Sequence, residues 1–520
     1  GGGVGLAIGG SVVAAADFGS GGWGDDLEIK GSAPAEVTAG NFLITQTLHL
    51  KPGVTLRGPG RAAATLCSPS DRQIPVTFHH YRSIVELSSR SALENLTINA
   101  TPGEDHHAVL IRGTSDAALR HCEIINLRPT FHPNGKWVPS DNLVSATQHT
   151  YRLVVEDNIL RGQIPFSHWG GEMTELYFAH NLCEGLPTQS ANLSLRGLRR
   201  SIIEHNRITR SGRGLVVAGE AVHNYIAFNI IENIRGTSNG CEMFLYELGG
   251  TPWQGSPADI TPNSFTTPGK TWEDNTLRST ADSFIFTCYA LVTSGRGIGQ
   301  CIPIASAQQQ TITLARPWTV PPDSASTIML VHGCFENIHV ENQFKEGVAF
   351  SGVFGAAARN VWAGDEFERV SDGMVLWSLG RDHPISLNLL RDLRLQERAG
   401  ILLIAGLETA KPLQQVAMLG NEIRTSQIYS RQRYPGNEYG LGNRVWRYGF
   451  NDTPPGNARH VTFGSEAAIH LSAFFDWPGN HTDEDPKLDQ SIPPHPLDPH
   501  LRFPRRPLPP RRPHRPWHRT

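Results

Sequence analysis

Two glutamates near the middle of the chain hold the same position relative to a recurring asparagine. Glu172 lies nine residues before Asn181, and Glu220 lies nine residues before Asn229. In the repeat between them, Gly197 takes the same position. If each repeat is one rung of stacked strands, two rungs place the carboxylates roughly 10 Å apart. That spacing is near the upper limit for inverting glycoside hydrolysis, so both are predicted catalytic residues. The alternative is that they bind backbone amides at turns.

A second acidic stretch precedes Glu247 and alternates apolar with polar or aromatic residues, as a strand does. The alternation predicts that Cys241, Met243 and Leu245 point inward, and that Glu242, Phe244 and Tyr246 point outward. A carboxylate beside two aromatic rings suits sugar binding, because the rings pack on pyranose faces and the carboxylate accepts hydrogen bonds from hydroxyls. Glu242 is the preferred catalytic residue, with Glu247 as its partner. Phe244 and Tyr246 are predicted to contact the substrate.

Five further residues are expected near these carboxylates. His168 is a candidate acid or base, although a lone histidine is more often structural, and Trp169 beside it is a candidate sugar platform. Arg196 lies on the intervening rung and would bind a carboxylated sugar, while Trp253 would wall the cleft. His149 holds the Glu172 position one rung earlier.

The element that must position these residues is a solenoid of β-strands. Single polar residues recur between apolar segments at Asn158, Asn181, Asn206 and Asn229, at intervals of 23, 25 and 23 residues. After a gap of 113 residues the pattern resumes with Asn342, Asp365, Asp392 and Asn421. A fixed period in this range indicates a repeat architecture. A buried asparagine at one turn of every coil is expected to stack into a hydrogen-bonded ladder.

Composition agrees with a turn-rich β protein and excludes several classes. The 520 residues include 52 Gly and 36 Pro, and only 18% are charged. A net charge of −3 carries no nucleic-acid signature, and no apolar run is long enough to span a bilayer. The seven cysteines form no CxxC pair, so no metal site is predicted. Pairing of Cys288 with Cys301 is left open.

The N-terminal strands resemble a known family. The segment LKPGVTLRGPG, residues 50–60, resembles the first complete rung of parallel β-helix proteins of the pectin-lyase-like class, and residues 93–98 and 119–124 continue the pattern. The resemblance covers roughly residues 40–470 and implies an all-β, right-handed parallel β-helix that handles polysaccharides. The motifs of its named enzyme families are absent, so the resemblance specifies architecture better than activity.

The long gap in the repeat predicts an inserted domain. We expect a leader with a signal-peptide remnant over 1–40, β-helix over 41–250 and 332–470, an inserted β-module over 251–331, and a disordered Pro/Arg-rich tail over 471–520. Within the insertion, the stretch from Gly295 to Gln300 resembles the GxGxGQ-type module of β-helix proteins on bacterial and phage surfaces. There it implies a structural role.

The predicted function is that of a secreted, periplasmic or cell-surface protein acting on a polysaccharide or oligosaccharide. A glycoside hydrolase with paired carboxylates is favoured. A polysaccharide lyase is the alternative within the enzyme class, with His168 as base and either Arg196 or calcium neutralising a uronate. A non-catalytic adhesin or tailspike-like protein is the competing class. No cofactor is expected for the hydrolase, and the oligomeric state, homotrimer or monomer, is open.

Overall fold

The structure is a computed structural model that describes the chain in segments. These are residues 7–8, 11–12, 27–29, 34–69, 83–102, 107–127, 142–186, 191–235, 242–247, 250–273, 288–347, 352–354, 356–370, 374–377, 380–393, 401–404, 413–419, 422–425, 448–451 and 481–482. Every element within these segments is a β-strand. They contain no helix with the length and apolarity needed to cross a bilayer.

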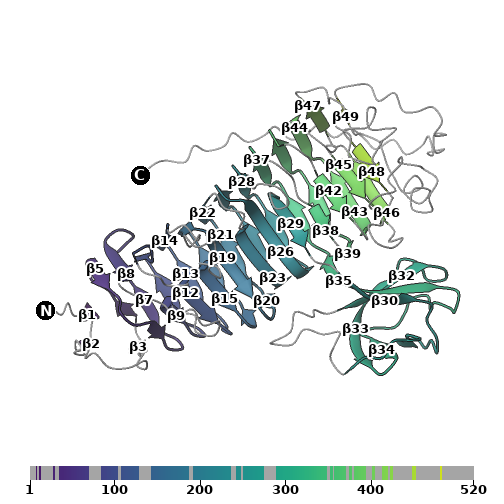
Figure 1. Ribbon diagram of the computed structural model, residues 1–520, viewed down its shortest axis with the longest axis horizontal. Coiled ribbons are helices and arrows are strands. Elements are labelled where there is room, and N and C mark those ends of the chain that lie inside the picture. Colours follow the sequence, from purple (N-terminus) through teal and green to yellow (C-terminus); the bar gives the residue numbers. More distant parts are fainter. Residues whose placement is uncertain are drawn as a thin grey trace, which may run out of the picture. The chain divides into compact units, whose positions relative to one another are not determined.

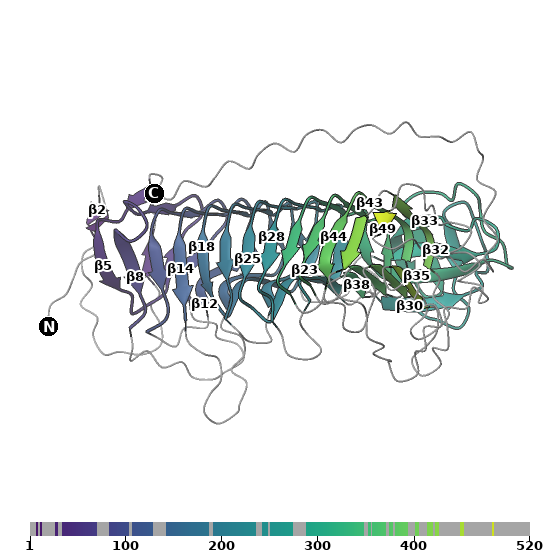
Figure 2. The ribbon, with the colours of Figure 1, turned by 90° about the horizontal axis from the view of Figure 1, so that it is seen from above.

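Each coil of the chain supplies strands to three columns, and each strand pairs in parallel with its counterparts in the preceding and following coils (Figures 1 and 2). The first column consists of β3 (Leu27–Ile29), β6 (Leu48–Leu50), β9 (Ser83–Leu87), β12 (His107–Arg112), β15 (Asn142–Thr147), β19 (Ile164–Trp169), β23 (Ala191–Arg199), β26 (Arg213–Val222), β29 (Phe244–Glu247), β38 (Gly352–Phe354), β42 (Met374–Trp377), β45 (Ile401–Ile404) and β48 (Tyr448–Asn451). The second column consists of β4 (Ala35–Glu36), β7 (Thr55–Arg57), β10 (Ala92–Glu94), β13 (Ala118–Arg120), β17 (Val154–Glu156), β21 (Tyr177–Ala179), β24 (Ile202–Glu204), β27 (Tyr225–Ala227), β36 (Ile338–Val340) and β40 (Val361–Ala363).

The third column forms a sheet of its own. It consists of β5 (Gly40–Leu43), β8 (Ala64–Cys67), β11 (Thr97–Asn99), β14 (Glu123–Asn126), β18 (Ile159–Gly162), β22 (Leu182–Glu184), β25 (Arg207–Thr209), β28 (Ile230–Glu232), β37 (Gln343–Lys345), β41 (Glu366–Glu368), β44 (Leu389–Leu393), β47 (Glu422–Thr425) and β49 (His481–Thr482). Further strands join the first and second columns at β16 (Thr150–Tyr151), β20 (Met173–Thr174), β39 (Ala356–Ala358), β43 (Gly380–Ser386) and β46 (Leu413–Leu419). The predicted right-handed parallel β-helix is confirmed. A further pair, β1 (Ala7–Ile8) and β2 (Ser11–Val12), is antiparallel.

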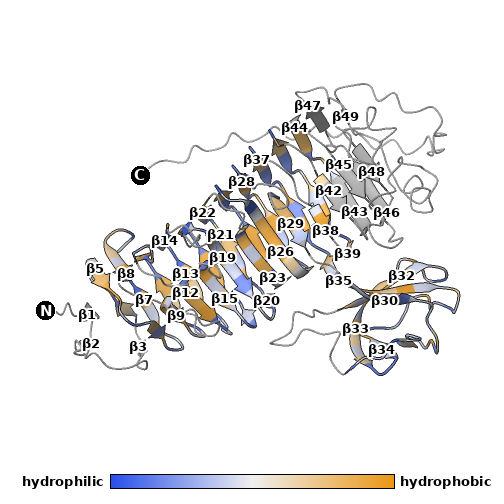
Figure 3. Ribbon diagram, viewed as in Figure 1, coloured by the Kyte–Doolittle hydropathy of each residue, from blue (hydrophilic) through white to orange (hydrophobic). Residues whose placement is uncertain are grey.

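The core lies between the columns and is built from inward side chains that repeat from rung to rung. In the third column the inward side chains stack rung upon rung in the order Leu66, Ile98, Ile124, Leu160, Cys183, Ile208, Ile231, Phe344, Phe367 and Leu390. Successive rungs are ~4.8 Å apart, so each side chain contacts its equivalents above and below. Apolar residues follow β12 and β26 of the first column in the same way (Figure 3).

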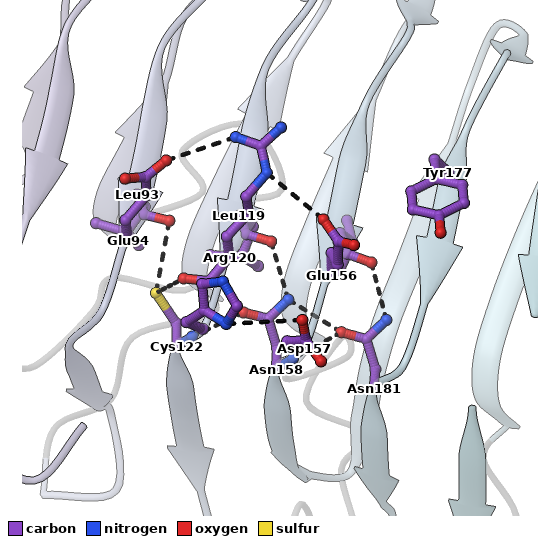
Figure 4. Close-up of polar contacts among 12 residues, drawn as sticks. Leu93, Glu94, Leu119, Arg120, Cys122, Glu156, Asp157, Asn158, Tyr177 and Asn181 are labelled. Atoms are coloured by element: carbon purple, nitrogen blue, oxygen red, sulfur yellow. Dashed lines mark hydrogen bonds and ion pairs between the residues drawn. The ribbon is translucent and has the colours of Figure 1, made fainter. Parts of the chain in front are cut away.

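The predicted asparagine ladder is present at the turn between the second and third columns. Asn158 donates from its amide nitrogen to Asn181 Oδ1 at 3.0 Å and to the Leu119 carbonyl at 2.9 Å (Figure 4). The same pair of bonds recurs along the axis as far as Asn342, which donates to Asp365. The next member is Asn388, not Asp392 as the sequence pattern predicted, because the interval stays at 23 residues. Asn421 lies outside the described residues.

A second ladder, which sequence reasoning missed, occupies the turn before the second column. Ser201 donates its backbone N–H to Asn224 Oδ1 at 3.0 Å. Asn224 donates to Asn337 Oδ1 and Asn337 to Asn360 Oδ1, both at 2.8 Å. The residue just before each member of this ladder has a positive φ, a backbone conformation that is costly for any residue other than glycine. The ladder fixes those turns by satisfying their buried backbone groups.

Charged residues on these turns pair between rungs. Arg152 binds both Asp116 oxygens, at 2.6 and 2.9 Å, and Arg200 binds Glu175 at 3.2 Å. On the outward side of the second column, Arg120 lies between Glu94 and Glu156 (Figure 4). These charges link one coil to the next, so we assign them a structural role.

The inserted module is an antiparallel sheet whose last strand continues into the β-helix. It consists of β30 (Gly250–Gly255), β31 (Ser264–Thr266), β32 (Tyr289–Ser294), β33 (Cys301–Gln308), β34 (Thr311–Leu314) and β35 (Thr327–Phe335). The first part of β35 pairs with β30 and β32, and its end pairs in parallel with β26 and β39. Cys288 and Cys301 lie in different apolar clusters, and the two thiols are not joined in a disulfide bond.

Candidate functional site

An arginine joins the two glutamates that the repeat had aligned. Glu172 directly precedes β20, Arg199 ends β23, and Glu220 lies near the end of β26. The register pairs Met173 with Leu198 and Leu198 with Ala221, which stacks Glu172, Gly197 and Glu220 on consecutive rungs. Arg199 Nε lies 3.3 Å from Glu172 Oε1, and Arg199 Nη2 forms an ion pair with Glu220 Oε1.

The three side chains differ in their access to solvent. The Glu220 side chain is 0% exposed, whereas Glu172 is 20% and Arg199 is 17% exposed. Burial alone lowers the pKa of Arg199, but Glu220 and Glu172 outweigh it, and the net shift is upward. A buried carboxylate is stable only when it is paired and hydrogen-bonded. Glu220 therefore serves to hold Arg199, and Glu172 is the carboxylate that a ligand can reach.

His149 supports Glu172 from the preceding rung. The Glu172 backbone N–H donates to His149 Nδ1 at 3.1 Å. Because Nδ1 accepts this bond, the imidazole carries its hydrogen on Nε2. The sequence placed His149 at the same offset as Glu172, and the structure brings the two together.

The inserted module approaches the same cluster. Tyr289, on β32, packs against Val222 and Phe335 in an apolar cluster shared by the module and the β-helix. Burial raises the pKa of the Tyr289 hydroxyl, and Glu220 raises it further, while Arg199 acts in the opposite direction. Tyr289 therefore lies within electrostatic range of the pair and borders it on the module side.

Trp169 and Arg196 lie on neighbouring rungs of the first column and point outward. The Arg196 guanidinium carbon is 4.5 Å from the centroid of the Trp169 ring, and both side chains are half-buried. Such a contact is a cation–π interaction. Backbone pairing continues this outward row from Arg196 through Ala218 to Glu247, which places Glu247 two rungs from Arg196.

The predicted role of His168 is wrong, because this side chain is enclosed in the core. It is 0% exposed, and its Nδ1 and Nε2 lie 2.7 Å and 2.8 Å from the carbonyl oxygens of Arg196 and Gln148. Burial lowers its pKa, against the effect of these two contacts. Neighbouring residues in a strand face opposite sides, so an outward Trp169 requires an inward His168.

Phe244 and Tyr246 are also buried, so the predicted sugar contacts are wrong. They are 1% and 0% exposed, and the Tyr246 hydroxyl is hydrogen-bonded to His339 Nε2 at 2.7 Å. Pairing with β26 sets Phe244 against Leu215 and Tyr246 against Val217, both inward residues. Leu245 faces the other way. A shift of one residue reverses the direction of every side chain of a strand. The alternation in the sequence indicated the strand but assigned its inward and outward residues the wrong way round.

Glu242 does not join the Glu172 cluster. It pairs at 3.0 Å with Arg213, which is the first residue of β26. Glu220 lies seven residues after Arg213 on the same strand, a distance of roughly 23 Å along an extended chain. Glu242 and Glu247 are five residues apart, or ~16 Å in an extended strand, which exceeds the separation of paired carboxylates in glycosidases. The pairing of Glu242 with Glu247 is therefore not supported.

Trp253 belongs to the interior of the inserted module. Its ring centroid is 6.3 Å from that of Phe265, and it packs against the apolar cluster on the side of the module away from Tyr289. The prediction that Trp253 lines the cleft is therefore wrong, and Tyr289 is the module residue that lies near Glu220.

Arg199 and Tyr289 are the residues that sequence reasoning missed. A signal for Arg199 existed, since residues two apart in a strand share a face and Arg199 follows Gly197 by two. Tyr289 had none, because docking of the module is a tertiary event. No group of three His, Cys, Asp or Glu side chains among the described residues is arranged to hold a metal, and calcium remains a prediction for the lyase alternative.

Comparison with known proteins gives structural likeness only. No protein-family model and no curated sequence matches the chain. Among solved structures, the Dettilon tailspike protein is 12% identical with a TM-score of 0.41, over 76% of this chain and 62% of that one. A mannuronic acid specific polysaccharide family 6 lyase from human gut microbiota is 11% identical with a TM-score of 0.41, over 88% and 87%. The periplasmic alginate epimerase AlgG is 8% identical with a TM-score of 0.41, over 81% and 85%.

Proposed function

We propose that the protein binds an acidic polysaccharide along the outward row of the first column and cleaves it by β-elimination. The observation that carries this proposal is the placement of Glu172, a carboxylate that reaches solvent, beside Arg196 and Arg199. Glu172 is aligned with Gly197, the residue that follows Arg196, so the base and the guanidinium lie on adjacent rungs.

The chemistry assigned to each group follows from its exposure and charge. Arg196, stacked on Trp169, binds the carboxylate of a uronate, and the Trp169 edge packs on the sugar ring. Glu172 removes the proton next to that carboxylate as general base. A carbon–carbon double bond then forms as the glycosidic C–O bond breaks, and the leaving oxygen takes its proton from solvent. The guanidinium groups stabilise the negative charge that develops, as fixed cations do at an enolate. Glu220, which is enclosed, keeps Arg199 in place.

Hydrolysis is the second candidate, and the two-rung stack of Glu172 and Glu220 favours it. This mechanism requires one carboxyl group to carry a proton while the other activates water. Arg199 contacts both carboxylates and Glu220 is fully buried, so hydrolysis also requires Arg199 to move when the substrate binds. For this reason elimination ranks first.

The test is a panel of acidic and neutral glycans incubated with the whole protein. Elimination is expected to raise the ultraviolet absorbance of unsaturated uronates, and Glu172→Gln should lower kcat by about 10²-fold or more. Glu175→Gln is the matched control, since Glu175 lies on the same coil, is exposed and pairs with Arg200. Reducing ends without the absorbance change would favour hydrolysis. Binding without turnover would leave a glycan-binding protein, and equal activity of Glu172→Gln and the wild type would exclude this site.

A further inference from the structure

Asp365 occupies a ladder position where its neighbours are asparagines. The members of the first ladder, from Asn158 onward, are Asn158, Asn181, Asn206, Asn229, Asn342, Asp365 and Asn388. The Asp365 side chain is 1% exposed, and the strand that follows it, β41, pairs in parallel with the strands that follow Asn342 and Asn388. An ionisable group is therefore enclosed in a row of neutral amides.

One oxygen of Asp365 reproduces the asparagine pattern. Its Oδ1 accepts the Asn342 backbone N–H at 2.8 Å and the Asn342 side-chain N–H at 3.0 Å. The Asp365 backbone N–H donates to Asn388 Oδ1 at 2.9 Å, as in the other rungs. The ladder therefore passes through Asp365 without a change of register.

The other oxygen stands where an asparagine has its N–H₂ group. In the ladder, that nitrogen donates to the Oδ1 of the next ladder residue and to a backbone carbonyl one rung back. This carbonyl belongs to the middle residue of a second-column strand. It is the Ile226 carbonyl for Asn342 and the Trp362 carbonyl for Asn388. The corresponding carbonyl for Asp365 belongs to His339, the middle residue of β36. Asp365 Oδ2 is buried and has no hydrogen-bond partner. It lies among acceptors at a position that calls for a donor.

We propose that Asp365 is protonated in the folded protein and that its O–H replaces the asparagine N–H, donating to the Asn388 amide oxygen or the His339 carbonyl. The proton then links the rung of Asn342 to the rung of Asn388. Its loss would leave a buried carboxylate facing acceptors, which weakens that link.

The surroundings of Asp365 favour the protonated form. Burial raises the pKa of Asp365 to about 7, while the two hydrogen bonds from Asn342 act against the rise and the Glu341 carboxylate adds to it. On the packed strands, Glu366 lies beside Asp365, Lys345 and Glu368 lie at the far ends of β37 and β41, and Arg391 and Asp392 are the third and fourth residues of β44. The His339 ring faces away, toward Tyr246.

The sign of the pH dependence follows from the direction of this shift. The folded-state pKa lies above 3.8, the usual pKa of an aspartate in the unfolded chain. The stability contributed by the proton is therefore complete below pH 3.8 and is lost as the pH rises through about 7. The link is expected to be strong in acid and weak above neutrality.

The experiment compares Asp365→Asn with the wild type by urea unfolding of the whole chain at several pH values. The two should unfold at similar urea concentrations near pH 4. At pH 8 the unfolding equilibrium constant of the variant should be about 10²- to 10³-fold smaller. Asp157→Asn, which removes a half-exposed carboxylate from the ladder turn of Asn158, is the matched control and should show no such divergence. An infrared band of a protonated carboxyl group should persist at pH 6 in the wild type and vanish in Asp365→Asn.

Two results would overturn the proposal. One is a difference in stability between Asp365→Asn and the wild type that stays constant from pH 4 to pH 8. The other is the absence of a protonated carboxyl band in the wild type at pH 6. The infrared measurement decides the question on the wild type alone if the variant does not fold.

Discussion

His339 is a neutral histidine held among aromatic rings in the core. Its Nε2 is 2.7 Å from the Tyr246 hydroxyl, and its ring stacks on Trp362 with a centroid distance of 5.3 Å. Phe244 approaches its edge at 4.7 Å. Burial lowers the pKa of His339 to about 3. The residues that the sequence assigned to sugar binding, Phe244 and Tyr246, instead form the wall around this histidine.

This burial predicts acid sensitivity. The folded-state pKa of His339 lies below the usual 6.5, so its contribution to stability is complete above pH 6.5 and is lost as the pH falls toward 3. The double variant Tyr246→Phe with His339→Phe removes both members of the hydrogen bond, so no polar atom is left unpaired. We expect a smaller decrease of the urea midpoint between pH 7 and pH 5 than in the wild type. His180→Ala, at an exposed turn, should keep the wild-type dependence. An unchanged slope in the double variant would contradict the assignment.

At the scale of elements, the turns are held by ladders and not by glycines. Many turn residues with positive φ carry side chains, and several of them, such as His205 and Phe228, directly precede a ladder asparagine that bonds along the axis. Each interior asparagine fills two acceptor and two donor roles, as Asn206 does with Asn181, Asn229 and the Phe178 carbonyl. A ladder residue therefore stabilises its own coil and both neighbours.

Asn206→Ala is expected to lower the free energy of unfolding by about 2–4 kcal/mol, because it leaves the Asn181 N–H and the Phe178 carbonyl buried without partners. Chemical unfolding monitored by circular dichroism measures the change. Asn41→Ala, at an exposed strand position, is the control and should stay within ~0.5 kcal/mol of the wild type. Equal effects of the two substitutions would show that the ladder contributes little.

At the scale of the molecule, the inserted module and the β-helix share a strand and an apolar cluster. The strand is β35, which pairs antiparallel within the module and parallel within the coils. Val222 and Phe335 of the coils pack in that cluster with Tyr289 and Leu291 of the module. The module therefore folds onto the β-helix beside Glu220, and its position affects the candidate site.

Phe335→Ala tests this connection. Phe335 is 1% exposed, and its ring centroid is 4.3 Å from that of Tyr289. We expect a loss of about 3–5 kcal/mol in the free energy of unfolding and faster proteolysis between the module and the coils. Leu43→Ala, at a residue 63% exposed, should change neither. Normal stability and proteolysis of Phe335→Ala would mean that the module and the coils fold independently.

The sequence by itself determined the coil, the ladder and the existence of the insertion. These follow from local turn chemistry repeated at a nearly constant interval, which appears directly in residues such as Asn158, Asn181 and Asn206. It also aligned Glu172 with Glu220, because equal offsets from the ladder mean equal positions on their rungs, which are two rungs apart. The error at Asp392 came from an interval of 27 residues, whereas Asn388 lies between two leucines at the regular interval of 23.

Only the tertiary structure decided which residues face a ligand. Side chains alternate along a strand, so the pairing of β29 with β26, and not the composition of β29, sends Phe244 and Tyr246 inward. The tertiary structure also places Glu242 beside the start of β26 and Glu220 near its end. It brings Arg199 between Glu172 and Glu220, where it pairs with both. These contacts connect residues on different coils and on the module, and the interval between repeats carries no information about them.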